Sequence, residues 1–200
     1  MPVYRTPSAP HIYEYEEKRS RFVAHLAHLN SETEFKELLS TIRKEHPKAS
    51  HHCWAYILDM PNNVHSWNQS DDGEPKGTAG KPMLNILTHA DVGECCVIIA
   101  RYFGGTKLGT GGLVRAYSAA TKLVLDEAQW APLEAKVNVK LFSDYQEINQ
   151  VQRWMQQNNI QPINQTFEEK VQINLQITES QFDELLSCLL YTSPSPRDRG

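Results

Sequence analysis

The residues best suited to bind a phosphate gather in one glycine-rich segment, Arg101–Gly112. Nine of the ten glycines in the chain fall between Gly73 and Gly112. Glycine permits positive φ angles and a close approach of the backbone to another group. The segment joins an apolar stretch to the expected start of a helix, where free backbone N–H groups favour an anion. The pattern therefore predicts an anion-binding turn.

Cationic and aromatic side chains accompany these glycines. Arg101, Lys107 and Arg115 could supply charge to a phosphate, and Tyr102 or Phe103 could stack on a base. The alternative is that the glycines serve only tight turns and close packing, and the sequence leaves both interpretations open. The residues expected to bind an anion or nucleic acid are Lys81, Arg101, Tyr102, Phe103, Gly104, Gly105, Lys107, Gly109, Gly111, Gly112 and Arg115.

An acidic turn with the sequence SDDGEP precedes this segment at Ser70–Pro75. Asp71, Asp72 and Glu74 could hold a metal or transfer protons, but carboxylates spaced this closely suit Mg²⁺ poorly without other ligands. The simpler interpretation is a solvated turn that caps the helix after Pro82 or pairs with a nearby arginine. The role of the acidic turn stays open at this point.

Motifs for nucleotides and metals are incomplete. Six residues instead of four separate Gly73 from Gly80, so the spacing of a P-loop fails. Val114 stands where a dinucleotide fingerprint needs its third glycine. Neighbours within His51–Cys53 point to opposite faces of the expected strand, and no spaced Cys or His pair completes a zinc site. We therefore expect no catalytic residue, no metal ligand and no cofactor.

Composition narrows the classes of function. The 200 residues carry a net charge of −4, with 40% hydrophobic and 22% charged residues, as in ordinary soluble globular proteins. This balance argues against the broad basic field of a general nucleic-acid binder, but it allows a local basic patch. The apolar run Cys95–Ala100 is too short to cross a membrane. Four cysteines, two of them adjacent, fit a reducing compartment, so we expect a cytoplasmic protein.

Hydrophobic periodicity predicts the elements that position these residues. Residues 1–19 are polar and contain three prolines, which suggests an extended arm. Ser31 begins a helix with a capping box, in which Glu34 reaches back to the Ser31 N–H, and Pro47 ends it. The remaining patterns predict strands over 21–29, 52–58 and 95–102, a long polar loop over 59–80, and helices over 82–89 and 113–127.

The character of the chain changes beyond residue 130. Residues 131–187 contain no glycine and many Gln and Asn side chains. Alternation predicts a strand over 137–141 and a hairpin of 160–167 with 171–177, with one helix after Ser143 and another from Phe182. The order β-α-β-β-α is that of a split βαβ fold without its last strand. We expect two domains, 1–130 and 131–187, the second of them truncated.

The last residues, 188–200, end in SPSPRDRG. They resemble the translation of an adapter used to prepare sequencing libraries, so we expect a non-native tail that takes no part in the fold. A natural Ser/Pro-rich tail is the alternative.

Several blocks taken together resemble the Impact family, in particular its bacterial YigZ branch. The resemblance covers residues ~15–187, and its blocks occur in the family's order. They are SDDGEP at Ser70–Pro75, GTAGKP at Gly77–Pro82, RYFGG at Arg101–Gly105 and LGTGGLVRAY at Leu108–Tyr117, with Lys18, Ser20–Phe22 and His51–Cys53 in support.

The resemblance implies an α+β protein. Its first domain is expected to be an α/β sandwich like domain 2 of ribosomal protein S5, and its second a ferredoxin-like domain of order βαββα that lacks the last strand. Eukaryotic members carry a further N-terminal domain and restrain a translation kinase, but residues 1–19 are too short to form that domain.

For function, the resemblance implies a non-enzymatic regulator linked to translation. Such a protein would bind RNA, the ribosome or a translation-associated protein through the glycine-rich segment, and it would not contact a membrane. One alternative is an enzyme that binds a nucleotide or phosphate ligand in the same cleft, with Asp71 and Asp72 as metal-binding or basic groups. A second alternative is a pure protein-interaction module. The sequence leaves the oligomeric state open.

Overall fold

The computed structural model describes residues 4–145, 148–167 and 169–190. The chain forms two compact units, Met1–Leu133 and Glu134–Gly200, here called unit 1 and unit 2. Both combine helices with antiparallel sheets, which confirms the mixed α and β class. No helix within the described ranges is long and apolar enough to span a bilayer. Most of the expected non-native tail, from residue 191 onward, lies outside the described residues.

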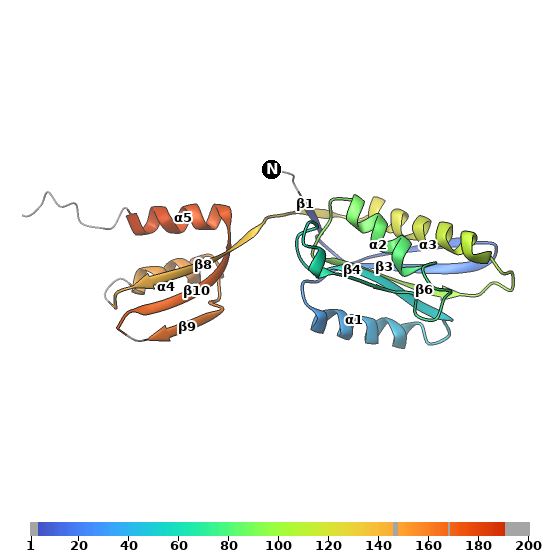
Figure 1. Cartoon of the computed structure of the whole chain (residues 1–200), viewed down its shortest axis with the longest axis horizontal. Helices are drawn as coiled ribbons and strands as arrows, with labels where there is room; N and C mark the ends of the chain where they lie inside the picture. The colour runs from blue at the N-terminus through green and yellow to red at the C-terminus, as the bar shows by residue number, and fades with distance from the viewer. Residues whose placement is uncertain (1–3, 146–147, 168, 191–200) are drawn as a thin grey trace, which may run out of the picture. The chain divides into compact units, whose positions relative to one another are not determined.

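A five-stranded antiparallel sheet forms the middle of unit 1, in the order β2-β3-β6-β4-β5 (Figure 1). The central strand β6 is buried from Cys95 to Arg101 because both of its faces are covered, as its apolar run predicts. The strands are β2 (His11–Glu17), β3 (Ser20–His28), β4 (His51–Ile57), β5 (Trp67–Ser70) and β6 (Cys95–Tyr102).

Helices cover both faces of this sheet, with α2 and α3 on one face and α1 on the other (Figure 1). Successive side chains of a strand point to opposite faces, so β6 contributes to two cores. Val97 and Ile99 join the core under α2 and α3, whereas Cys96 and Ile98 join the core under α1. The helices are α1 (Glu32–Glu45), α2 (Gly80–His89) and α3 (Gly109–Asp126).

The N-terminal segment was expected to be an extended arm, and in the structure it contains two strands, β1 (Tyr4–Pro7) and β2 (His11–Glu17). β2 lies at the edge of the sheet and pairs with β3 through a tight turn at Lys18 and Arg19, both with positive φ. Tyr13 and Tyr15 alternate with Glu side chains and pack against the core. This period-two pattern is the signal of a strand that the prolines and acidic residues obscured.

The pairing of the first strand places the end of unit 1 later in the chain than predicted. β1 (Tyr4–Pro7) pairs with β7 (Trp130–Leu133) in a two-stranded sheet, and the Arg5 guanidinium lies 4.9 Å from the centre of the Trp130 ring. Unit 1 therefore runs to Leu133 instead of ending at the expected residue 130.

Two segments that were expected to be loops are partly regular. The expected loop 59–80 contains a short 3₁₀ helix, Val64–Ser66, and the strand β5, in which Trp67 packs against the core. The helix α3 starts at Gly109 instead of Leu113, so Gly109–Gly112 form its first turn.

The start of α1 follows the expected cap with one change. The Ser31 hydroxyl accepts the Glu34 N–H, with oxygen and nitrogen 3.3 Å apart. The Glu34 carboxylate, however, accepts the Asn30 N–H instead of the Ser31 N–H. Both bonds satisfy donors that a helix start leaves free.

Unit 2 is a three-stranded antiparallel sheet in the order β8-β10-β9 with two helices. The buried residues of β10, such as Ile173 and Leu175, alternate with polar ones and join the core that the helices complete. The order β-α-β-β-α agrees with the sequence prediction. The elements are β8 (Lys136–Ser143), α4 (Ile148–Gln157), β9 (Asn164–Phe167), β10 (Val171–Thr178) and α5 (Glu179–Leu190).

The first residues of the expected tail continue α5. Cys188 and Leu189 pack against the core of unit 2. The Gln150 amide donates to the Cys188 carbonyl oxygen at 2.8 Å. Regular structure therefore extends beyond the expected limit of residue 187.

Gly104 and Gly111 make a matched pair for testing the packing of unit 1. A Cβ at Gly104 would overlap the backbone of Arg19 and Ser20, whereas a Cβ at Gly111 would meet nothing closer than 3.7 Å. We expect Gly104→Ala to lower the free energy of unfolding by about 2 kcal/mol through overpacking. We expect Gly111→Ala to raise it by about 0.5 kcal/mol, because alanine loses less backbone entropy in a helix. Urea denaturation measures both, and equal effects would contradict the close approach at Gly104.

Candidate functional site

The acidic turn Ser70–Pro75 fixes the start of α2. The Asp71 carboxylate accepts the N–H groups of Gly77, Ala79 and Gly80, at 2.7, 3.0 and 2.9 Å. A carboxylate at this place satisfies free donors and stabilises the positive end of the helix dipole. Asp71 thus has the capping role that the sequence offered as the simpler interpretation.

Asp72 ties the same turn to the opposite layer of unit 1. Its backbone has a positive φ of 41°. One carboxylate oxygen accepts the backbone N–H of His52 at 2.6 Å, and the other accepts from the Arg43 guanidinium of α1 at 2.8 Å. Asp72 therefore pairs with an arginine, as the simpler interpretation also suggested.

Glu74 is buried and forms an ion pair with Arg101. One Glu74 oxygen accepts from the Arg101 guanidinium at 2.5 Å and from the Tyr117 hydroxyl at 2.9 Å. Arg101 is 6% exposed, and its guanidinium also lies 3.5 Å from the Ser20 hydroxyl. This burial corrects the expectation that Arg101 contacts a phosphate, and it shows that Glu74 is not a solvated residue of the turn.

The thiol and the hydroxyl next to this ion pair are not activated for catalysis. The Cys53 sulfur lies 3.2 Å from the Tyr117 hydroxyl and 3.0 Å from the Asp71 carbonyl oxygen. Burial raises the pKa of the Cys53 thiol and of the Tyr117 hydroxyl, so both groups stay protonated at neutral pH. Neither is therefore an activated nucleophile or base.

The aromatic residues and glycines of the segment Arg101–Gly112 divide into packed and exposed ones. The Tyr102 hydroxyl lies 2.8 Å from His46 Nδ1, and its ring lies under the Arg21 guanidinium at 4.5 Å, so Tyr102 is not a free stacking face. Gly104 packs against Arg19 and Ser20. Phe103, by contrast, is 51% exposed.

Exposed cations surround the start of α3. Lys107 and Arg115 are exposed, and an added Cβ at Gly111 would lie 3.7 Å from Arg115 Nη1, which places this guanidinium beside the first turn. Leu108, the residue before that turn, makes no side-chain cap hydrogen bond. Gly105 and Gly109 have positive φ angles and open space around them. The first N–H groups of α3 thus face solvent among positive charges, which favours an anion.

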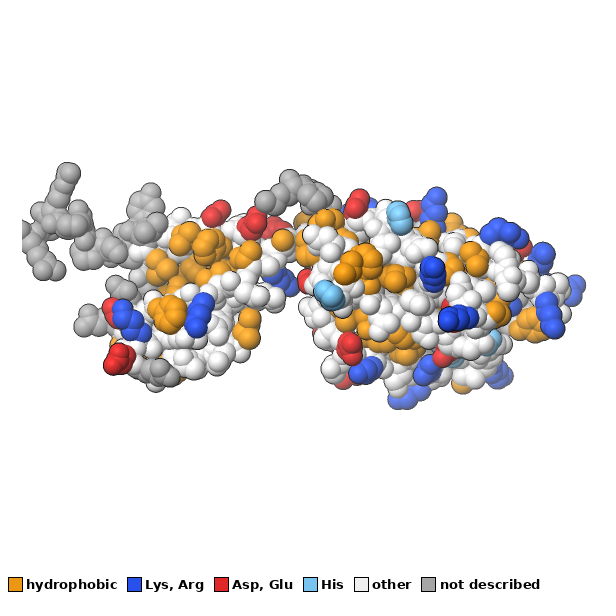
Figure 2. Space-filling view, viewed as in Figure 1, with side chains coloured by type: hydrophobic (Ala, Val, Ile, Leu, Met, Phe, Trp, Pro, Cys, Tyr) orange, Lys and Arg blue, Asp and Glu red, His pale blue; other side chains and the backbone are white. Residues whose placement is uncertain are grey.

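The structure adds two cations that the sequence analysis did not place here. The turn at Lys18 and Arg19 lies against Gly104, and both side chains are exposed. Figure 2 shows Lys and Arg side chains gathered at the end of unit 1 where α3 starts. We call the exposed set Lys18, Arg19, Phe103, Lys107 and Arg115 the basic end. The pairing of β3 with β6, which sets Arg21 opposite Tyr102, brings the turn with these two cations beside Gly104.

Lys81 lies apart from the uncapped helix start. It is exposed in the first turn of α2, whose N–H groups Asp71 already caps. Gly112 packs beside the Leu108 side chain and so has a packing role. Of the expected binding residues, the structure leaves Phe103, Lys107 and Arg115 exposed in or just before the first turns of α3, together with Gly105, Gly109 and Gly111.

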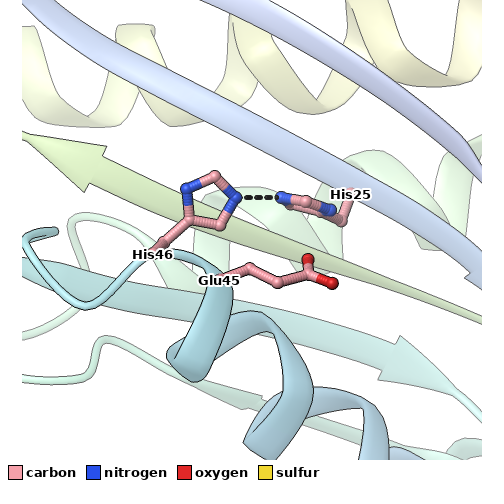
Figure 3. A group of neighbouring side chains, drawn as sticks. All are labelled: His25, Glu45 and His46. Carbon is pink, nitrogen blue, oxygen red and sulfur yellow. Dashed lines mark hydrogen bonds between the residues drawn. The ribbon is translucent and has the colours of Figure 1, made fainter.

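A cluster of His25, Glu45 and His46 on the α1 side of the sheet was not predicted from the sequence (Figure 3). The two histidines are 21 positions apart, and their Nε2 atoms lie 2.9 Å from each other. The only local signal was a histidine at the end of a predicted helix, a place that favours a cation.

Replacing Glu74 tests how strongly the ion pair holds unit 1 together. Glu74→Gln keeps the shape of the side chain but leaves the buried Arg101 charge without its partner. We expect it to lower the free energy of unfolding by about 3–5 kcal/mol, and Glu74→Gln with Arg101→Met to recover part of that loss. Chemical denaturation measures both, with the exposed Glu37→Gln as a control near zero. A Glu74→Gln protein as stable as the control would refute the importance of the pair.

Comparison with known proteins gives the family. Residues 18–125 match the Impact N-terminal domain. An IMPACT family member of Haemophilus influenzae is 35% identical over 187 residues, which are 94% of this chain and 91% of that protein. The IMPACT family member YigZ of Escherichia coli is 44% identical over 125 residues, or 62% of this chain and 61% of YigZ.

A solved structure shares the fold of this chain. The crystal structure of a hypothetical protein superposes with a TM-score of 0.84, at 33% sequence identity, over 96% of this chain and 94% of that one. The match extends over both units and over the motifs that carried the resemblance. The chain therefore belongs to the Impact family.

Proposed function

We propose that this protein is a non-enzymatic regulator linked to translation, and that it binds RNA, on the ribosome or free, through the basic end. The observation that carries the proposal is the set of four exposed cations around an uncapped helix start with an exposed aromatic ring. The N–H groups of α3 and the side chains of Lys107 and Arg115 suit a phosphate. Phe103 offers a face on which a base could stack.

The charge of the whole chain does not oppose this role. The net charge is −4, but exposed charges act over about 10 Å in 0.1 M salt. A phosphate at the basic end therefore interacts mainly with nearby groups, which are the cations Lys18, Arg19, Lys107 and Arg115 and the carboxylates of Glu16 and Glu17 beside the turn. The alternative of a general, sequence-independent nucleic-acid binder is not favoured, since such proteins carry a much broader basic surface.

The layers of both units support the finer fold assignments as proposals. A five-stranded sheet between α1 and the pair α2 and α3 suits an S5 domain 2-like unit. The order β8-α4-β9-β10-α5 suits a ferredoxin-like unit of the βαββα type. A cytoplasmic location also remains a proposal. It is supported by Cys53, Cys95 and Cys96, which are buried free thiols.

An enzyme is less well supported by the same geometry. Asp71 accepts three backbone N–H groups, Asp72 pairs with Arg43, and Glu74 pairs with Arg101. These carboxylates are engaged in contacts that hold the fold. Calorimetric titration with nucleotides and Mg²⁺ separates the two ideas, because tight binding that depends on Asp72 would favour the enzyme.

Reversing charge at the basic end tests the proposal. We expect Lys107→Glu with Arg115→Glu to weaken binding to ribosomal RNA by at least about tenfold, since two phosphate contacts become repulsive. Binding of the unchanged protein should fall steeply with added salt, and the variant should show a shallower salt dependence. Filter binding over a salt series and co-sedimentation with polysomes measure both effects.

A charge-matched control separates this surface from net charge. Lys36→Glu with Lys122→Glu makes the same change of charge at exposed positions near the start of α1 and in the second half of α3, and it should leave RNA binding unchanged. Equal weakening by both pairs would contradict a specific surface. If no salt-sensitive association is found, the RNA proposal fails. Retained binding to a protein partner in the basic-end variant would instead support the protein-interaction alternative.

A further inference from the structure

Three side chains able to ligate a metal converge where α1 ends beside the sheet. His25 comes from β3, Glu45 from the last turn of α1, and His46 is the C-terminal cap of that helix (Figure 3). One ligand atom of each lies within 4.8 Å of the others. We propose that His25, Glu45 and His46 bind one Zn²⁺ ion.

The two histidines are already close to a chelating geometry. Their Nε2 atoms are 2.9 Å apart, and the two rings are inclined at 71°. Two nitrogens bound to one tetrahedral zinc at about 2.0–2.1 Å lie about 3.3 Å from each other. If the two rings moved slightly apart and the proton between the two Nε2 atoms moved to an Nδ1 atom, both Nε2 lone pairs could point at one zinc ion.

The charges around this place favour a cation. The negative end of the α1 dipole and the Glu45 carboxylate both attract positive charge. The nearby Arg43 does not compete, because its guanidinium is bound to Asp72.

Neighbouring groups hold His46 in place for this task. The Tyr102 hydroxyl lies 2.8 Å from Nδ1 of His46, so a proton on Nδ1 would leave the lone pair on Nε2. The His52 ring lies 3.2 Å from the His46 carbonyl oxygen and fixes the backbone of the helix cap. Outer partners of this kind orient metal-binding histidines in known sites.

The donor set defines the kind of site. Two imidazoles and one carboxylate suit zinc, and they leave a fourth position for water. Glu45 is exposed and His46 is half-buried, so this position opens to solvent. A bound ion would also link β3 to the end of α1, and it should stabilise unit 1 by mass action.

Zinc titration of the tag-free full chain tests the site. After dialysis against a chelator, calorimetry with ZnCl₂ should give one ion per chain, and saturating Zn²⁺ should raise the melting temperature by several degrees. His25→Gln and His46→Gln should each weaken binding by at least about 100-fold, whereas Tyr102→Phe should weaken it by about tenfold. The exposed His89→Gln is the control and should bind as the unchanged protein does.

Two results would overturn the proposal. The first is zinc affinity in His25→Gln and His46→Gln equal to that of the His89→Gln control. The second is a lack of stoichiometric binding by the unchanged chain. Circular dichroism of the metal-free variants shows whether they fold. Visible absorption of the Co²⁺ form gives an independent readout, because a tetrahedral spectrum should appear in the unchanged chain and vanish in His46→Gln.

Discussion

The buried ion pair of Glu74 and Arg101 is the interaction on which the rest of unit 1 depends. Arg101 lies near the end of the central strand, and the Glu74 carboxylate reaches it from the turn before α2. A charge taken out of water is costly unless an opposite charge and hydrogen bonds compensate it. The Tyr117 hydroxyl and the Ser20 hydroxyl provide further polar partners. The pair thereby fixes the acidic turn against β6, α3 and the start of β3.

This pairing decides which motif residues remain free to act on other molecules. With Glu74 held inside, Asp71 can cap α2 and Asp72 can reach α1. The conspicuous SDDGEP turn is thus mainly architectural. The surface that we propose for binding is the basic end, where the first turn of α3 and Phe103 are exposed. A family motif can therefore mark a site without supplying the groups that touch the ligand.

Local periodicity predicted most elements because the apolar pattern of each one is complete within its own residues. The central strand 95–102 and the hairpin of unit 2 are examples. Predictions failed for strands in which few apolar residues stand among polar or charged ones. In β2 the Tyr side chains alternate with Glu, and in β5 the single Trp67 supplies the large apolar contact. Such strands are stable only through pairing with β3 and β4, which the sequence does not display.

The sequence by itself determined the class of fold, the order of the elements and the kinship with the Impact family, since these depend on local pattern and on long motifs. Only the tertiary structure decided the chemistry available at each residue. It buried Arg101 against Glu74, brought Lys18 and Arg19 beside Gly104, and set His25 against His46. These partners are separated along the chain, so their charge, exposure and protonation follow from burial and pairing instead of from residue type.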